Sequence, residues 1–150
     1  MRAVVQRVSE ASVKVAGEVV GKIGHGLLVL CGFSREETPD DLSWMARKIA
    51  ALRVFDDQDG VMNLSLLQTG GDILAVSQFT LMASTRRGNR PSYIEAASPD
   101  ISEPLYEEFL SELEKALGKG VERGRFGACM EVSLVNDGPA TYYLDSKKPL

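Results

Sequence analysis

The sequence predicts a single α/β domain over residues 1–150, in which a curled mixed β-sheet forms a partial barrel and carries two main helices. Three observations lead to this fold class. Segments with a strand pattern outnumber segments with a helical pattern, several strands follow one another in hairpin order, and no internal repeat or low-complexity tract divides the chain. A chain of 150 residues is long enough to bury one substantial core.

Strand patterns fill the first part of the chain. Residues 2–8 and 11–15 alternate between apolar and polar side chains, as a half-buried strand does. Residues 16–18 (Ala-Gly-Glu) predict a turn that leads into a hairpin partner at Val19-Val20. Residues 27–33 (LLVLCGF) are continuously apolar, which indicates a strand buried on both faces.

Two segments have the pattern of amphipathic helices. The first covers residues 39–52, with Thr38 as the N-cap and Pro39 in the first turn. The second covers residues 102–117, where apolar side chains recur at helical spacing and Gly118 stands at the position of a C-terminal cap.

The remaining strands are predicted from short apolar runs. Residues 52–55 (LRVF) are expected to return as a strand, and a buried strand is expected from Ile73 to about Gln78. A last pair of strands is expected at 129–135 and 140–145. The turn between them would be Asn-Asp-Gly-Pro, which is unusual because proline cannot donate to a sheet.

Composition limits the classes of function. The net charge of −4 argues against nonspecific coating of nucleic acid, although a local basic patch stays open. No apolar run approaches the ~20 residues of a membrane-spanning helix. Cys31 and Cys129 do not suggest a secreted disulfide scaffold, so a reducing cytoplasm is the predicted location.

No metal or cofactor is predicted. A Cys/His zinc site lacks ligands, because the only histidine, His25, lies between two glycines and is interpreted as a turn residue. Residues 56–60 (DDQDG) weakly resemble a calcium loop without its remaining ligands, so a solvated turn is predicted. An all-carboxylate metal site stays open, and no glycine-rich phosphate loop is present.

Polar residues at the end of a buried strand are the first candidate site. Ser77, Gln78, Phe79 and Thr80 end the strand that starts at Ile73, and strand ends present polar groups from a rigid base. A serine or threonine nucleophile needs a neighbouring base, and no histidine is near in sequence. Two interpretations therefore stay open, a functional site and hydroxyl groups that cap the strand end.

Arginines form the second candidate site. Arg86, Arg87 and Arg90 follow closely after Thr80, and their forked donors suit phosphate groups. A solvated loop is the competing interpretation. Arg7 interrupts the first strand, where a charge is costly unless it is paired.

Three motifs together closely resemble the D-aminoacyl-tRNA deacylases. They are SQFTL at 77–81, RGNRPSY at 87–93 and NDGPAT at 136–141. The resemblance runs nearly end to end and includes MRAVVQRVSEASVKVAGEVVGKIGHGLLVL, ARKIAALRVFDD, MNLS and FGACMEVSLVNDGPAT. It implies the fold of these deacylases and an esterase that frees tRNA from D-amino acids and from glycine mischarged on tRNA(Ala), while sparing L-aminoacyl-tRNA.

The resemblance also implies roles for the candidate residues. Ser77, Gln78, Phe79 and Thr80 would form the catalytic site. Main-chain N–H groups of Phe79 and Thr80 would stabilise the oxyanion, while the 2′-hydroxyl of the terminal adenosine assists the attack. The alternative, a Thr80 hydroxyl nucleophile, lacks a visible base. On the same resemblance Arg86, Arg87 and Arg90 could grip tRNA phosphates.

A homodimer is the last implication of the resemblance. Gly138-Pro139, joined by a cis peptide bond and braced by Arg7, would enter the partner's active site and select the chirality of the aminoacyl group. Ala140 departs from the usual Gly-Pro-Val-Thr, which puts the tightness of L-rejection in doubt. Two other functions stay open, a non-catalytic tRNA-binding or nucleic-acid-binding module and a generic serine or threonine hydrolase of small esters.

Overall fold

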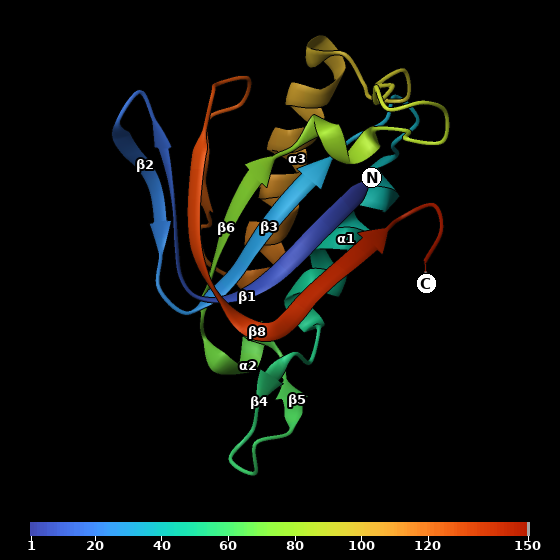
Figure 1. Cartoon of the computed structure of the whole chain (residues 1–150). Helices are drawn as coiled ribbons and strands as arrows, with labels where there is room; N and C mark the ends of the chain where they lie inside the picture. Colours follow the sequence, from blue (N-terminus) through green and yellow to red (C-terminus); the bar gives the residue numbers. More distant parts are fainter. Residues whose placement is uncertain (150) are drawn as a thin grey trace.

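The computed structural model describes residues 1–149 and contains one six-stranded mixed sheet, a separate two-stranded sheet and helices packed on the large sheet (Figure 1). The strand order in the large sheet is β2-β1-β3-β6-β7, and β8 pairs with β1. The predicted fold class, a curled mixed sheet with two main helices, is confirmed. The elements are β1 (Arg2–Val15), β2 (Glu18–Ile23), β3 (Gly26–Gly32), α1 (Pro39–Ala51), β4 (Phe55–Asp56), β5 (Met62–Leu64), α2 (Leu66–Thr69), β6 (Asp72–Ser77), the 3₁₀ helix η1 (Phe79–Met82), α3 (Pro99–Leu117), β7 (Glu122–Arg123) and β8 (Glu131–Asp145).

Strands β1 and β8 are long and pair with each other. The predicted strand pattern of residues 2–8 and 11–15 lies in one continuous strand, and β1 pairs with β3 over its first half and with β2 over its second half. The predicted pair of strands at 129–135 and 140–145 is wrong, since both segments pair with β1 as one strand, β8. Residues 136–139 therefore interrupt a strand and do not form a hairpin turn.

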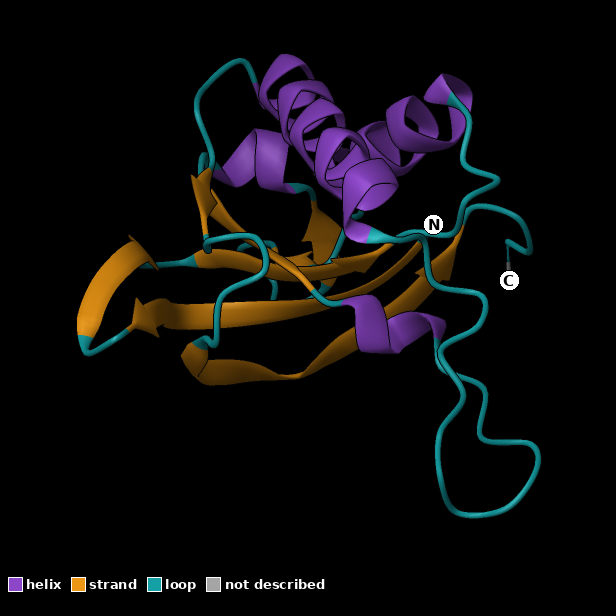
Figure 2. Cartoon of the chain, turned by 90° about the horizontal axis from the view of Figure 1, so that it is seen from above, coloured by secondary structure: helices purple, strands orange, loops and turns teal. Residues whose placement is uncertain are grey.

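Helices α1 and α3 lie together on one side of the large sheet (Figure 2). Thr38 caps α1 as predicted, because its Oγ1 accepts the Asp41 N–H at 3.3 Å while the Asp41 carboxylate accepts the Thr38 N–H at 2.8 Å. Helix α3 begins at Pro99, three residues before the predicted start, because Ser98 is its N-cap. The predicted cap Gly118 adopts φ 74° at its end.

The core lies between the helices and the sheet. Tyr106 and Phe109 of α3 are fully enclosed there, and the Tyr106 hydroxyl donates to the Ala75 carbonyl at 2.9 Å. A smaller apolar cluster fills the opposite side of the sheet, where β2 and β8 curl over it. The sheet is thus buried on both sides, as the apolar run of β3 predicted.

The predicted strand 52–55 is wrong. Only Phe55 and Asp56 form a strand, β4, which pairs with β5 and not with the large sheet. Val54 is buried although it lies outside any strand. The apolar residues of this segment therefore pack on the core and do not pair with a strand of the large sheet. The short helix α2 was not predicted, because four residues are too few to show a helical period.

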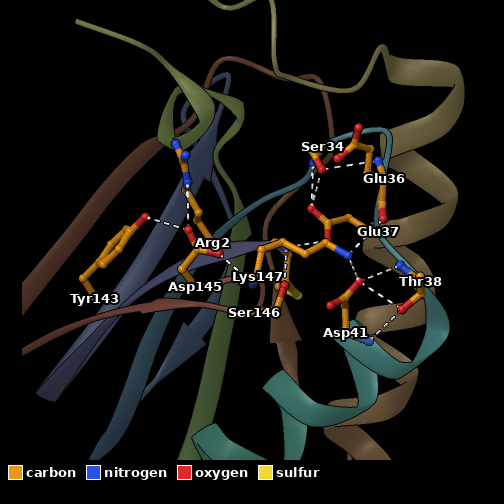
Figure 3. A network of polar contacts seen from close by, with 11 residues as sticks. Arg2, Ser34, Glu36, Glu37, Thr38, Asp41, Tyr143, Asp145, Ser146 and Lys147 are labelled. Carbon is orange, nitrogen blue, oxygen red and sulfur yellow. Dashed lines mark hydrogen bonds and ion pairs between the residues drawn. The ribbon is translucent and has the colours of Figure 1, made fainter. Parts of the chain in front are cut away.

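A polar network connects the end of β8 to the start of α1 (Figure 3), and Arg2 extends it to η1. Lys147 Nζ donates to Asp41 Oδ2 at 2.5 Å, and Arg2 Nη1 donates to the Leu81 carbonyl of η1 at 2.9 Å. Arg2 Nε also lies 3.4 Å from Asp145 Oδ2 at the end of β8. Among residues 1–149, no helix is both long and apolar enough to cross a membrane.

Candidate active site

The strand end at Ser77 turns directly into helix η1. The Gln78 N–H still donates to the Cys31 carbonyl of β3 at 2.7 Å, so the segment is fixed to the sheet up to this residue. Gln78 Nε2 then donates to Thr80 Oγ1 at 2.5 Å. The structure thus brings the four predicted residues Ser77 to Thr80 into one tight turn.

Two main-chain donors are left over at the start of η1. The first helical hydrogen bond at this end joins the Leu81 N–H to the Gln78 carbonyl at 3.2 Å. The N–H groups of Phe79 and Thr80 precede it, and the first N–H groups of a helix have no acceptor within the helix. Phe79 and Thr80 are exposed residues, and neither N–H donates a hydrogen bond within residues 1–149.

A cavity of about 450 Å³ opens beside this turn. It lies between the ends of β3 and β6, the start of α3 and the segment that leads into β8. Its lining is mostly apolar and includes Cys31, Phe33, Gln78, Phe79, Pro99 and Phe126. Burial raises the pKa of the Cys31 thiol, so this group stays protonated at neutral pH. An apolar cavity with polar groups at its mouth is typical of a ligand site.

The predicted arginine cluster lies on the loop that follows η1. This long loop stands out from the body of the protein in Figure 2. Arg86, Arg87 and Arg90 are all exposed, and the loop is closed at its base by two backbone hydrogen bonds between Ser84 and Ser92, at 2.8 and 2.9 Å. The structure therefore places the arginines close in the chain to the Ser77–Thr80 turn and open to solvent.

Arg7 is buried and holds the Gly-Pro segment. Only 6% of the residue is exposed, and its Nε donates to the Asp137 carbonyl at 2.9 Å. Its Nη1 donates to the Val54 carbonyl at 2.6 Å, and the carboxylates of Asp137 and Asp56 lie 3.3 and 3.4 Å from the guanidinium. The charge of Arg7 in the first strand is thus paired, which offsets the free-energy cost of burying it.

The Gly-Pro segment is a wide bulge in β8. Between the pairs Gln6–Thr141 and Val8–Asn136, β1 has one residue, Arg7, and β8 has four, residues 137–140. The Gly138–Pro139 peptide bond is cis, and both residues are exposed. Asn136 Nδ2 supports the bulge by donating to the Arg7 carbonyl at 2.9 Å.

One chain does not bring its two candidate segments together. Arg7 pairs with Leu27, which pairs with Ile73, so Ser77 lies four residues further along β6. At about 3.3 Å per residue this is ~13 Å along the strands, and β6 is two strands away from β1. In Figure 1 the bend of β8 lies at the lower edge of the sheet and η1 at the upper end.

The only histidine does not complete a catalytic pair with Ser77 or Thr80. His25 lines a second cavity of about 460 Å³ together with Arg7, Asp56 and Asp137, at the end of the sheet opposite to Ser77. Within residues 1–149, no group of three or more His, Cys, Asp or Glu side chains is arranged to hold a metal ion.

Comparison with known proteins assigns the family. The sequence profile of the D-Tyr-tRNA(Tyr) deacylase family matches residues 4–145. This chain belongs to that family. The D-aminoacyl-tRNA deacylases of Dechloromonas aromatica and Bacteroides thetaiotaomicron are 58% and 55% identical over 149 and 147 residues, and each alignment covers 99% or 98% of both chains.

Solved structures agree with the family's fold. A protein described as c-Myc DNA Unwinding Element Binding Protein aligns with a TM-score of 0.91 at 43% identity, covering 97% of this chain and 98% of its own. A probable eukaryotic D-amino acid tRNA deacylase aligns with a TM-score of 0.81 at 20% identity, covering 95% and 97%, and shares the fold.

Some residues that contact the predicted site residues were not found from the sequence. Tyr93 pairs with Phe79, with ring centroids 5.2 Å apart, and its place in the RGNRPSY motif was the only available signal. Val54 and Asp56 contact Arg7 from a hairpin 47 and 49 residues away, which no local pattern could indicate. Ala140, the departure from the usual motif, is buried at the end of the bulge.

Proposed function

We propose that this chain hydrolyses the ester bond of D-aminoacyl-tRNA, releases tRNA and the D-amino acid, and rejects L-aminoacyl-tRNA. Membership of the D-Tyr-tRNA(Tyr) deacylase family supports a hydrolase acting on D-aminoacyl-tRNA. The observation that carries the finer proposal is the two-part geometry: one end of the sheet has free main-chain donors beside a cavity, and the other end has an exposed Gly138–Pro139 bulge held by a buried arginine. We place the reaction in the cytoplasm, where translation consumes aminoacyl-tRNA.

Catalysis is assigned to the main chain and to the substrate. The residues that line the cavity include no carboxylate, imidazole or amine, and the one thiol, Cys31, stays protonated. The Phe79 and Thr80 N–H groups would bind the oxyanion that forms when water adds to the ester carbonyl. The 2′-hydroxyl of the terminal adenosine would assist that attack, and the 3′-oxygen leaves with a proton. Ser77 and Gln78 would shape the site and contact the adenosine.

Chiral selection is assigned to a second copy of the chain. Since Gly138–Pro139 cannot reach Ser77–Thr80 within one chain, a homodimer would place the bulge of one copy over the cavity of the other. D and L residues share all bonds, so fixed backbone close to the α-carbon discriminates by excluding one direction of the side chain. Glycine has no side chain to exclude, and glycine mischarged on tRNA(Ala) would therefore also be hydrolysed.

The arginine loop is assigned to the tRNA backbone. Arg86, Arg87 and Arg90 are exposed next to the proposed catalytic turn, and guanidinium groups bind phosphate oxygens in pairs. The same loop favours a second candidate function, a non-catalytic nucleic-acid-binding module. The structural relative described as a DNA-binding protein, at 43% identity, supports that alternative as well.

One assay separates the candidates. The purified protein is offered D-tyrosyl-tRNA, L-tyrosyl-tRNA and a D-tyrosyl ester without RNA, with no added metal. The deacylase hydrolyses only the first of these three substrates. Equal hydrolysis of both enantiomers indicates a generic esterase, and binding without hydrolysis indicates the nucleic-acid-binding module. A tRNA that ends in 2′-deoxyadenosine is expected to be a poor substrate, and unimpaired turnover would remove the RNA hydroxyl from the mechanism.

A matched pair of variants at Phe79 isolates a main-chain donor. Phe79→Ala removes the ring and keeps the N–H, whereas Phe79→Pro removes both. Proline suits the first position of a helix, and the preceding Gln78 is already outside the helical region at φ −146° and ψ 83°. We expect kcat of the proline variant to be ~10²-fold below that of the alanine variant, as for loss of one oxyanion donor. Equal kcat values would contradict the assignment.

A further inference from the structure

An exposed aromatic pair connects the Ser77–Thr80 turn to the base of the arginine loop. Phe79 belongs to the turn and Tyr93 follows the loop; they are 57% and 43% exposed, and their rings meet edge to face at an angle of 63°. About half of the surface of each residue is therefore open to a ligand. Exposed aromatic rings at such a place are typical of surfaces on which unpaired bases stack.

The position of Tyr93 is fixed by the backbone around it. Ser92 exchanges two backbone hydrogen bonds with Ser84 on one side of the tyrosine. On the other side, the carbonyl of Ile94 accepts from Arg35 Nη2 at 3.2 Å, and the Ala97 N–H donates to the Phe33 carbonyl at 2.9 Å. A ring held in this way loses little conformational freedom on binding.

The charge of the loop suits a polyanion. Residues 84–94 contain three arginines and no acidic residue, in a chain whose net charge is −4. The three arginines lie on the loop that ends next to Tyr93 in the chain, so phosphate contacts along the loop would accompany stacking on the aromatic pair.

We propose that the Phe79–Tyr93 pair and the arginine loop bind the unpaired nucleotides that immediately precede the terminal adenosine of the substrate tRNA. Phe79 lines the cavity and also contacts Tyr93. If the terminal adenosine occupies the cavity, the nucleotides before it would therefore pass over Tyr93. The bases stack on the rings, while their phosphates face the arginines. This inference rests on the proposed function, because it assigns a further part of the same substrate.

Substrates of increasing length test the inference. We would measure kcat/KM for D-tyrosyl-adenosine, for the D-tyrosyl trinucleotide CCA and for D-tyrosyl-tRNA, with wild type and with Tyr93→Leu. Base stacking on an aromatic side chain supports roughly a tenfold gain per base. We expect the ratio of kcat/KM for the trinucleotide to kcat/KM for D-tyrosyl-adenosine to be about tenfold lower in Tyr93→Leu than in wild type. Tyr93→Phe keeps the ring and should have the wild-type ratio. Leu67→Ala, which removes a 51% exposed apolar side chain from α2, is the control and keeps the full gain.

Several results would overturn the inference. In the first, the kcat/KM of wild type is the same for D-tyrosyl-adenosine and for the trinucleotide. In the second, Tyr93→Leu keeps the full increase in kcat/KM from adenosine to trinucleotide. In the third, Tyr93→Leu lowers kcat/KM equally for both substrates. A change in oligomeric state of Tyr93→Leu, measured by light scattering, would also overturn it by assigning this face to a contact between copies. In each of these cases the wild-type protein still hydrolyses D-tyrosyl-adenosine in preference to L-tyrosyl-adenosine, whereas failure of the proposed function itself leaves either no D-ester hydrolysed or both enantiomers hydrolysed equally.

Discussion

Replacement of Arg7 by methionine tests how the Gly-Pro bulge is held. Arg7 is 6% exposed and makes two short hydrogen bonds, to the carbonyls of Asp137 at 2.9 Å and of Val54 at 2.6 Å. Hydrogen bonds that involve a charged group contribute ~1.5–3 kcal/mol each, which gives ~3–6 kcal/mol for the two. Methionine fills much of the space of Arg7, and water can again solvate the half-exposed carboxylates of Asp137 and Asp56. We therefore expect the free energy of unfolding to fall by ~2–4 kcal/mol in total.

Urea denaturation at pH 7, followed by circular dichroism, measures this loss. Arg7→Lys should lie between wild type and Arg7→Met, because one ammonium group cannot reproduce the two-directional contacts of a guanidinium. Arg125→Met is the matched control, since Arg125 is exposed, and it should cost less than ~1 kcal/mol. An Arg7→Met protein as stable as the control would refute the role of these contacts. If it folds, its ratio of D-tyrosyl-tRNA to L-tyrosyl-tRNA hydrolysis should fall, because the bulge has lost its support.

Three further outcomes are expected. Burial opposes ionisation of Asp41, but hydrogen bonds from Lys147 and Thr38 lower its pKa to about 2. The stability that its charge provides is therefore complete above about pH 4 and lost as the pH falls through about 2. In urea denaturation, the difference in free energy of unfolding between wild type and Asp41→Asn should shrink toward pH 2. A difference that stays constant with pH would contradict this. A thiol reagent should modify exposed Cys129 quickly. It should modify Cys31 only after denaturation, because this thiol is buried and burial raises its pKa. Rapid modification of both thiols in the native protein would contradict the burial of Cys31. Thr80→Ala should keep turnover within about tenfold, and a folded but inactive variant would restore the hydroxyl nucleophile.

Local signals in the sequence were sufficient for some elements. Helix α1 was predictable because Thr38 and Pro39 mark its start and its apolar side chains recur every three or four residues. The buried strand before Ser77 was predictable because its apolar run ends at polar residues. Each of these signals lies within a few residues of the structure that it specifies.

Pairing partners distant in sequence decided the rest. Residues 136–139 have the composition of a hairpin turn, but Arg7, far away in the chain, pairs with them and makes them a bulge in one strand. Residues 52–55 have the composition of a strand, yet only Phe55 joins a ladder, and its partner is β5 of the small sheet. Likewise, the contact between Phe79 and Tyr93 depends on how a loop folds back, which neither residue indicates alone.

Complementation between two impaired copies tests most directly whether the active site is shared. One copy carries Phe79→Pro, which removes an oxyanion donor. The other carries Gly138→Val, whose added Cβ would lie 2.9 Å from Asn136 Oδ1 and alter the bulge. The two are co-expressed with different C-terminal tags, and the mixed species is purified and assayed with D-tyrosyl-tRNA and L-tyrosyl-tRNA. Phe79→Pro alone should be nearly inactive on both substrates, and Gly138→Val alone should hydrolyse both because its bulge no longer excludes the L form. The mixed dimer should hydrolyse D-tyrosyl-tRNA at about half of the wild-type activity per dimer and reject L-tyrosyl-tRNA, because its one working site has an intact turn facing an intact bulge. A mixed dimer that hydrolyses L-tyrosyl-tRNA as readily as Gly138→Val, or wild-type protein active as a monomer, would contradict the account.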